Sequence, residues 1–195
     1  SNSGPAFLVG SIGAGVFGSA RLGVGLYIIH VLAAAITGLF FRVDGKCRGN
    51  APAAPRESGG ALIESVRQAA QSILSVCGFI VCFCVIIGLL DAHGMFSLLA
   101  GQLAQITGLE LHAARAALSG FLELGSGIGA MRGLAVSPAN LAIAAGIVGW
   151  GGVSVHFQTY AVLADSDIKG GLHLAGRLIN CAVSATLGYI FGLLL

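Results

Sequence analysis

A carboxylate stands beside a cluster of glycines in an otherwise apolar part of the sequence. Glu123 is the only acidic residue within positions 111–164, and it is followed by the run Gly125-Ser126-Gly127. A carboxylate at membrane depth is costly and usually faces a cavity or a charged partner. This pattern favours a binding role for Glu123. The alternative is a structural role, in which Glu123 caps a helix or pairs with a residue such as Arg115 or Arg177.

A second polar group follows another pair of glycines. After Gly151-Gly152 the chain carries Ser154, His156 and Gln158 at spacings of two. Near a turn, these side chains can present a hydroxyl, an imidazole and an amide to one cavity. The free N–H groups at the start of a following half-helix would form a positive dipole end suited to an anion or a polar ligand. Alternatively, the side chains satisfy backbone groups that the break leaves open.

A third group consists of Asn2 and Ser3 in the expected turn Asn2-Ser3-Gly4-Pro5. An apparent repeat in the sequence relates it to the second group. The candidate substrate-binding residues are then Asn2, Ser3, Glu123, Gly125, Ser126, Gly151, Gly152, Ser154, His156 and Gln158.

Patterns for catalysis and metal binding are missing from the sequence. It contains no nucleophile elbow, phosphate loop or His/Glu zinc signature. Cys77, Cys82 and Cys84 lie in one apolar run, where Cys82 does not share a face with the other two, so no compact tetrahedral ligand set forms. We therefore expect no enzyme activity, no metal and no cofactor.

The composition defines the class of protein that must position these groups. Of the 195 residues, 56% are hydrophobic and 9% are charged, and the net charge is +2. Soluble domains carry roughly 25% charged residues. These values exclude a soluble enzyme domain, a disordered chain, a basic nucleic-acid-binding surface and a secreted disulfide scaffold. The sequence predicts an all-α, polytopic membrane protein, and its 31 glycines are about twice the usual share.

Charge-free stretches predict where helices cross the membrane. A straight crossing needs about 20 mostly apolar residues, which fits the charge-free stretches 22–41 and 68–90 and the segment 171–195, which carries a single charge at Arg177. The stretch 133–164 is too long for one ordinary helix and is interrupted around Gly151, so it predicts a re-entrant hairpin over 138–165 with its tip at the glycines.

Two further interruptions are predicted. The apolar segment Ala6–Phe17, which follows the turn at Gly4-Pro5, is expected to be the second arm of another hairpin. The segment 110–132 predicts a discontinuous membrane helix that is broken beside Glu123.

The polar linker 42–60 contains four basic residues, which the positive-inside rule places in the cytoplasm. Following the chain outward from this linker gives the two hairpins opposite orientations, as an inverted-topology repeat requires. At an offset of 147 residues, Gly4 matches Gly151. We therefore expect the end of a first repeat at 1–41 (half hairpin plus membrane helix), a cytoplasmic linker at 42–60 and a second repeat at 61–195.

Several runs resemble a known family. Residues Ser1-Asn2-Ser3-Gly4-Pro5-Ala6-Phe7-Leu8-Val9-Gly10 resemble the first hairpin of the YlbJ-like sporulation integral membrane proteins, and Gly149–Gln158 with Asp165-Ser166-Asp167-Ile168 is similar to their second. The stretch Ala61–Leu90 resembles the nucleoside-recognition (Gate) domain of that family, of concentrative nucleoside transporters and of the ferrous-iron transporter FeoB. The resemblance implies the C-terminal part of a multi-pass protein of the bacterial inner membrane, with transporter-like architecture and a role in spore cortex formation. It implies no particular substrate.

The leading hypothesis is a transporter-like protein that binds a polar solute near the bilayer midplane. The expected partners are the lipid bilayer, a small polar solute or ion, and a second copy of the chain or other sporulation membrane proteins, with no nucleic acid. The alternative is a membrane scaffold or sensor for sporulation complexes that does not transport.

Overall fold

The computed structural model describes residues 3–41, 60–163 and 170–195, and every element in these ranges is a helix. In chain order they are η1 (Ala6–Ala14), α1 (Ala20–Phe40), α2 (Ala61–Ala92), α3 (Met95–Thr107), α4 (Leu111–Leu122), α5 (Leu124–Ala130), α6 (Pro138–Trp150), α7 (Val153–Leu163) and α8 (Gly170–Leu193). The predicted linker 42–60 lies, apart from its last residue, outside the described residues.

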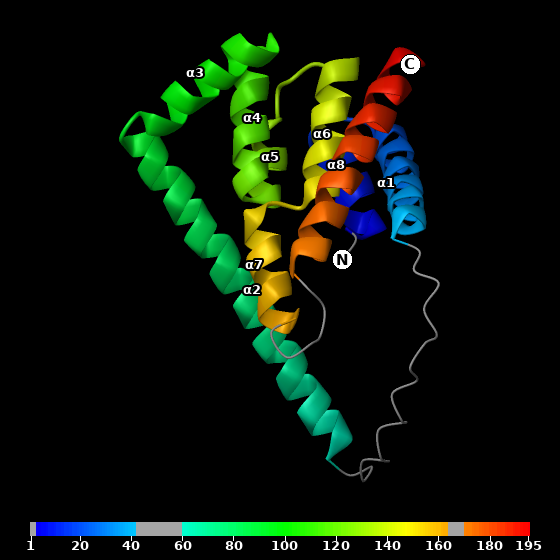
Figure 1. Cartoon of the computed structure of the whole chain (residues 1–195), viewed down its shortest axis with the longest axis vertical. Helices are drawn as coiled ribbons and strands as arrows, with labels where there is room; N and C mark the ends of the chain where they lie inside the picture. Colours follow the sequence, from blue (N-terminus) through cyan, green and yellow to red (C-terminus); the bar gives the residue numbers. More distant parts are fainter. Residues whose placement is uncertain (1–2, 42–59, 164–169) are drawn as a thin grey trace.

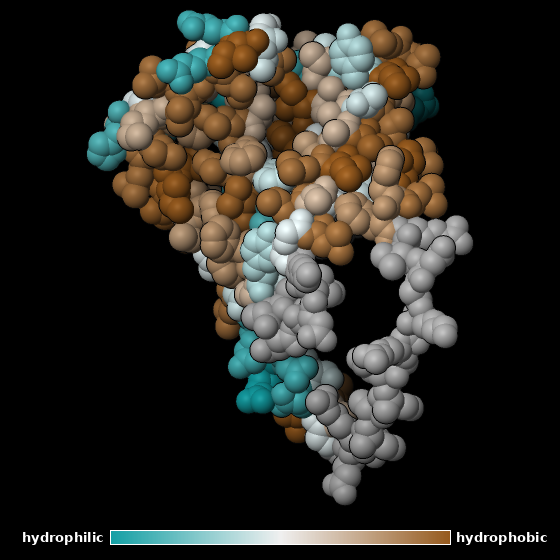
Figure 2. All heavy atoms as spheres, in the orientation of Figure 1, coloured by the Kyte–Doolittle hydropathy of each residue, from teal (hydrophilic) through white to brown (hydrophobic). Residues whose placement is uncertain are grey.

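Four segments are long and apolar enough to cross a membrane: α1, α2, α8 and the combined segment Pro138–Ala161. Large apolar side chains cover much of the visible face of the upper part of the molecule (Figure 2). The all-helical class and the predicted crossings at 22–41, 68–90 and 171–195 are therefore confirmed at the level of helix length and composition.

Local sequence signals start two of these helices. Ser19 precedes α1, and its hydroxyl accepts a hydrogen bond from the Leu22 backbone N–H at 3.5 Å. Ser137 accepts one from the Asn140 N–H at 3.2 Å, and Pro138 occupies the first helical position of α6. Both are serine N-caps, which satisfy backbone donors that the first turn leaves open.

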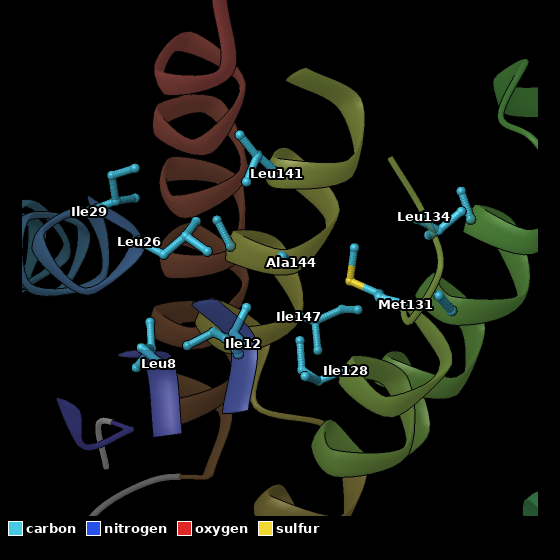
Figure 3. Packing of buried hydrophobic residues seen from close by; sticks show 14 residues of the cluster. Leu8, Ile12, Leu26, Ile29, Ile128, Met131, Leu134, Leu141, Ala144 and Ile147 are labelled. Atoms are coloured by element: carbon cyan, nitrogen blue, oxygen red, sulfur yellow. The ribbon is translucent and has the colours of Figure 1, made fainter. Parts of the chain in front are cut away.

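The centre of the bundle is formed by α6 and α8, which pack along each other, with α1 antiparallel to α8 (Figure 1). Small residues allow the close approach: a Cβ atom added at Gly188 of α8 would lie 2.8 Å from the Leu141 carbonyl oxygen of α6. Buried apolar side chains from η1, α1, α5 and α6 fill the space between these helices, among them Leu8, Ile12, Leu26, Ile128, Leu141 and Ile147 (Figure 3).

The segment 110–132 is a hairpin of two helices and not the predicted discontinuous helix. After Glu123 the chain reverses, and α5 returns along α4. Gly127 lies directly against the Gly120 backbone, and His112 near the start of α4 contacts the Ala130 carbonyl at the end of α5 at 2.8 Å. The reversal is possible because two glycines face each other where side chains would keep the helices apart.

In the segment 138–165, by contrast, the chain was expected to reverse and does not. The predicted break at the glycines is present, because α6 ends at Trp150 and α7 begins at Val153. However, α7 does not turn back along α6; it continues away from the break, displaced to one side (Figure 1). The predicted re-entrant hairpin is thus not confirmed here, and the two helices form one discontinuous segment. Left-handed backbone at Gly151 (φ +89°) and Gly152 (φ +85°) produces the lateral offset.

The predicted N-terminal arm is η1, a π-helix that packs against α1. Close packing of this arm does not depend on Gly10 or Gly18, since a Cβ atom added at either would meet nothing within 4 Å. Gly13 and Gly23 perform this role, since the two backbones touch there.

Helix α2 leans away from the bundle and meets it near α7 (Figure 1). At its end the chain turns sharply into α3 (Figure 1). Arg115 of α4 holds this corner: it donates to the Asp91 carboxylate at 2.7 Å and to the Ser97 hydroxyl at 2.6 Å.

Candidate functional site

The tip of the α4–α5 hairpin lies against the break between α6 and α7. A Cβ atom added at Gly152 would lie 2.9 Å from the Leu124 nitrogen and 3.2 Å from the Glu123 Cα. Two places where helices stop inside the bundle therefore meet at one point. Helix ends carry unsatisfied backbone groups, so their partners decide what this point can do.

The Glu123 carboxylate forms its hydrogen bonds within its own hairpin. It is 4% exposed, and its oxygens accept hydrogen bonds from the Gly125 N–H at 2.9 Å and the Ser126 N–H at 2.5 Å. A negative side chain at the first turn of α5 also complements the positive end of that helix. The predicted ion pair with Arg115 or Arg177 is not formed, because Arg115 pairs with Asp91 and, within the described residues, Glu123 bonds only to backbone N–H groups.

The end of α6 is held by side chains of α8. The Gly149 carbonyl accepts from the Asn180 amide at 3.0 Å and from the Arg177 guanidinium at 3.4 Å. Arg177 is only 8% exposed, so it does not extend to the membrane surface. Its guanidinium instead reaches Gly151, where an added Cβ atom would lie 3.5 Å from Nη2. A buried cation is thus placed at the break.

Trp150 joins the break to the hairpin. Its indole N–H donates to the Phe121 carbonyl at 2.9 Å, and the two rings stack with centroids 5.4 Å apart. This bond satisfies a carbonyl near the end of α4. Both rings border an apolar groove of about 340 Å³ between α4, α6 and α8, so Trp150 packs against apolar side chains.

The first turns of α7 carry two of the residues that the sequence predicts to bind substrate. The Ser154 hydroxyl is fully buried and has no hydrogen-bond partner among the described residues. His156 contacts His173 of α8 through Nδ1 at 3.2 Å, and its ring lies 4.2 Å from the Trp150 ring. The His156 Nε2 atom is also buried without a partner in the described part of the chain. These orphaned polar atoms are the groups that a bound solute or water would satisfy.

The structure thus brings seven predicted residues to the meeting point: Glu123, Gly125, Ser126, Gly151, Gly152, Ser154 and His156. Gln158 lies one turn further along α7 and faces α2. Ser3 donates its backbone N–H to His30 of α1 at 3.1 Å, and Asn2 lies outside the described residues. His30 accepts this hydrogen bond through Nε2.

Two residues of this region were missed from the sequence, His173 and Asn180. Asn180 follows Arg177 by three residues and so shares its helix face, and polar side chains in an apolar crossing usually face the bundle interior. This spacing could have identified Asn180. His173 carried no comparable signal.

Among residues 3–41, 60–163 and 170–195, no three His, Cys, Asp or Glu side chains cluster closely enough to hold a metal ion. Comparison of the chain with protein-family models, curated proteins and solved structures gives no match.

Proposed function

We propose that the chain is part of a secondary transporter in the inner membrane of a spore-forming bacterium, and that it binds a polar solute where the two helix breaks meet. One observation carries this proposal: Gly152 of the broken segment touches Glu123 of the hairpin tip inside a bundle of membrane-length helices. Broken helices at membrane depth are tolerated where they line a cavity, and transporters bind their cargo between them.

Helix lengths support a re-entrant hairpin made by α4 and α5. The two helices have 12 and 7 residues, about 18 and 10 Å at 1.5 Å per residue. Neither can cross about 30 Å of hydrocarbon. The hairpin would enter and leave on one side and end near the midplane, whereas α6 and α7 together would cross completely.

The solute would contact groups of both electrostatic signs. The partial positive charge at the start of α7 and the buried Arg177 guanidinium lie on one side of Gly151-Gly152. The Glu123 carboxylate and the Ser126 backbone lie on the other side. Ser154 Oγ and His156 Nε2, which have no partner in the described ranges, would supply hydrogen bonds to the solute.

An internal inverted repeat would allow alternating access. At an offset of 147, η1 (Ala6–Ala14) falls on 153–161, which lies within α7, and much of α1 falls on α8. The antiparallel direction of α1 and α8 supports the inversion. At the same offset His30 corresponds to Arg177, and each is a buried polar side chain that binds backbone beside the preceding short helix.

Flux measurements test this proposal. We expect the full-length protein in liposomes to take up one of a panel of labelled polar solutes (a nucleoside, a sugar and an amino acid). Uptake should fall in Glu123→Gln, which removes a hairpin-tip acceptor, and in Ser154→Ala. Thr186→Ala is the control, because that hydroxyl donates to the Ala182 carbonyl of its own helix at 2.9 Å. Unaltered uptake in both site variants would rule out this site.

The role in spore cortex formation follows from the resemblance of the sequence to YlbJ-like proteins. Complementation in a spore-forming host separates a transporter from a scaffold. A transporter predicts that Glu123→Gln and His156→Ala impair cortex formation. A scaffold predicts intact spores in both variants and a loss of function on changing residues of the 42–60 loop.

A further inference from the structure

A polar groove runs between α2 and α7, away from the site described above. It has a volume of about 660 Å³ and is lined by Gln68, Gln71, Ser72 and Ser75 of α2 and by Gln158 of α7. The four residues of α2 are spaced i, i+3, i+4 and i+7, so they form one stripe along the helix. These four residues carry amides and hydroxyls. One turn before them, the Gln68 amide donates to Glu64, whose carboxylate is paired with Arg67, so this end of the stripe has no net charge.

The other side of α2 at the same depth is apolar. Ile73 and Leu74, between the stripe residues in sequence, are 63% and 71% exposed. A membrane helix places its polar face toward protein or a water-filled cavity and its apolar face toward lipid. The polar stripe borders a groove with room for many water molecules, at about 30 Å³ each, so this surface suits water better than close helix packing.

An aromatic layer closes the groove on the side of the hairpin tip. The Phe157 ring of α7 lies 6.3 Å from the Phe79 ring and 5.9 Å from the Phe83 ring, measured between centroids. Immediately beyond this layer, the Cys84 thiol contacts the Ser126 hydroxyl at 3.4 Å. The order along α2 is then polar groove, aromatic layer and hairpin tip.

From this order we propose that the groove is a hydrated vestibule for an uncharged, hydrogen-bonding solute, and that the three phenylalanines separate it from the hairpin tip. The proposal rests on the transport function and names its access path. The basic loop 42–60 precedes α2, so the vestibule opens to the cytoplasm. Amide and hydroxyl groups match the hydroxyls or amides of a neutral solute and give no preference for either sign of charge.

Cysteine accessibility tests hydration without knowledge of the cargo. The other native cysteines are replaced by alanine in the full-length protein, and inside-out membrane vesicles are treated with a charged, membrane-impermeant methanethiosulfonate. We expect Ser75→Cys and Gln71→Cys to react at least about tenfold faster than Leu74→Cys, because hydrocarbon excludes a charged reagent. Leu74 is the matched control, since it lies at the same depth as Ser75 on the exposed apolar face, about 100° around the helix. Equal rates at positions 74 and 75 would overturn the vestibule.

A separate measurement tests whether the lining of the groove is uncharged. Cationic and anionic reagents should modify Ser75→Cys at rates within about tenfold of each other. A larger difference in rate would overturn the assignment to an uncharged solute.

The aromatic layer is tested with the native Cys84 as reporter. In a protein that retains only this cysteine, Phe157→Ala should make Cys84 reactive, whereas Phe191→Ala, on α8, should leave it unreactive. An unreactive Cys84 in Phe157→Ala would overturn the barrier. Neither labelling assay depends on flux, so a failed transport assay with a hydrated groove would reject only the transport function.

Discussion

Gly152 lies against Glu123 so closely that a Cβ atom at Gly152 would sit 3.2 Å from the Glu123 Cα. This contact joins the two helix breaks of the fold, and it requires glycine at position 152 for two reasons. The left-handed backbone (φ +85°) disfavours any side chain, and the hairpin tip fills the space that a side chain would need.

Gly152→Ala should therefore destabilise the protein by more than the roughly 1–2 kcal/mol of a left-handed alanine. The added methyl group must also displace backbone atoms at Leu124 and Glu123. Thermal unfolding of the purified protein in detergent measures the effect. Gly129→Ala is the control, because a Cβ atom there would meet nothing within 4 Å. Equal melting temperatures for the two variants would contradict the contact.

Trp150→Phe should lower stability by about 1–3 kcal/mol, the cost of leaving a buried backbone acceptor unsatisfied. The substitution keeps an aromatic ring against Phe121 and removes the N–H group that donates to the Phe121 carbonyl. Chemical denaturation in mild detergent provides the measurement. Phe121→Leu keeps the carbonyl bond and removes the stack, so it reports ring packing alone. A smaller loss of stability in Trp150→Phe than in Phe121→Leu would show that ring packing, and not the hydrogen bond, provides the stabilisation.

The positions of the breaks could be predicted from the sequence, but the direction of the chain after each break could not. Glycines and a lone acid identify Glu123 and Gly151-Gly152 as places where a helix stops. Whether the chain then reverses depends on which surfaces meet. At Glu123 it reverses because Gly120 and Gly127 touch across the hairpin; at Gly152 it continues because α7 packs against α2. Such contacts between distant segments leave little local signal.

The same limit applies to the candidate site. Ser154 and His156 were found because polar residues follow a glycine pair. Gln158 fits the same spacing of two, yet it lines a different groove. Because α7 is a helix, a spacing of two places successive side chains on different faces, so Ser154 and Gln158 share a face that His156 does not. His173 reaches His156 only through the packing of α7 near α8, and α8 begins after a stretch outside the described residues.

Gly23→Ala should weaken the packing of η1 on α1. A Cβ atom at Gly23 would lie 2.6 Å from the Leu8 carbonyl oxygen and from the Val9 Cα, so the two elements must separate. Gly38→Ala, on the same helix, meets nothing within 4 Å and should be neutral or slightly stabilising, since alanine is the better helix former. Limited proteolysis near residues 15–19 should be faster in Gly23→Ala alone. Equal cleavage rates for the two variants would show that the close contact does not hold η1 in place.

Asn180 connects three helices, so its replacement should disturb the end of α6. Its amide N–H donates to the Gly149 carbonyl at 3.0 Å, and its amide oxygen accepts from the Thr37 hydroxyl of α1 at 3.3 Å. Asn180→Leu removes both bonds at similar volume and should cost about 1–3 kcal/mol, because it leaves the buried carbonyl with only its longer bond to Arg177.

Thr37→Val removes only the bond between α1 and α8 and serves as the matched control for Asn180→Leu. In denaturant unfolding we expect it to cost less, about 0.5–1.5 kcal/mol, because Thr37 is partly exposed and its loss leaves the Gly149 contact intact. Solute uptake should follow the same order, since the Gly149 carbonyl lies two residues from Gly151 and fixes where the break begins. If Thr37→Val lowered stability and uptake as much as Asn180→Leu does, the attachment of α1 to α8 would position the break, and the bond to Gly149 would not.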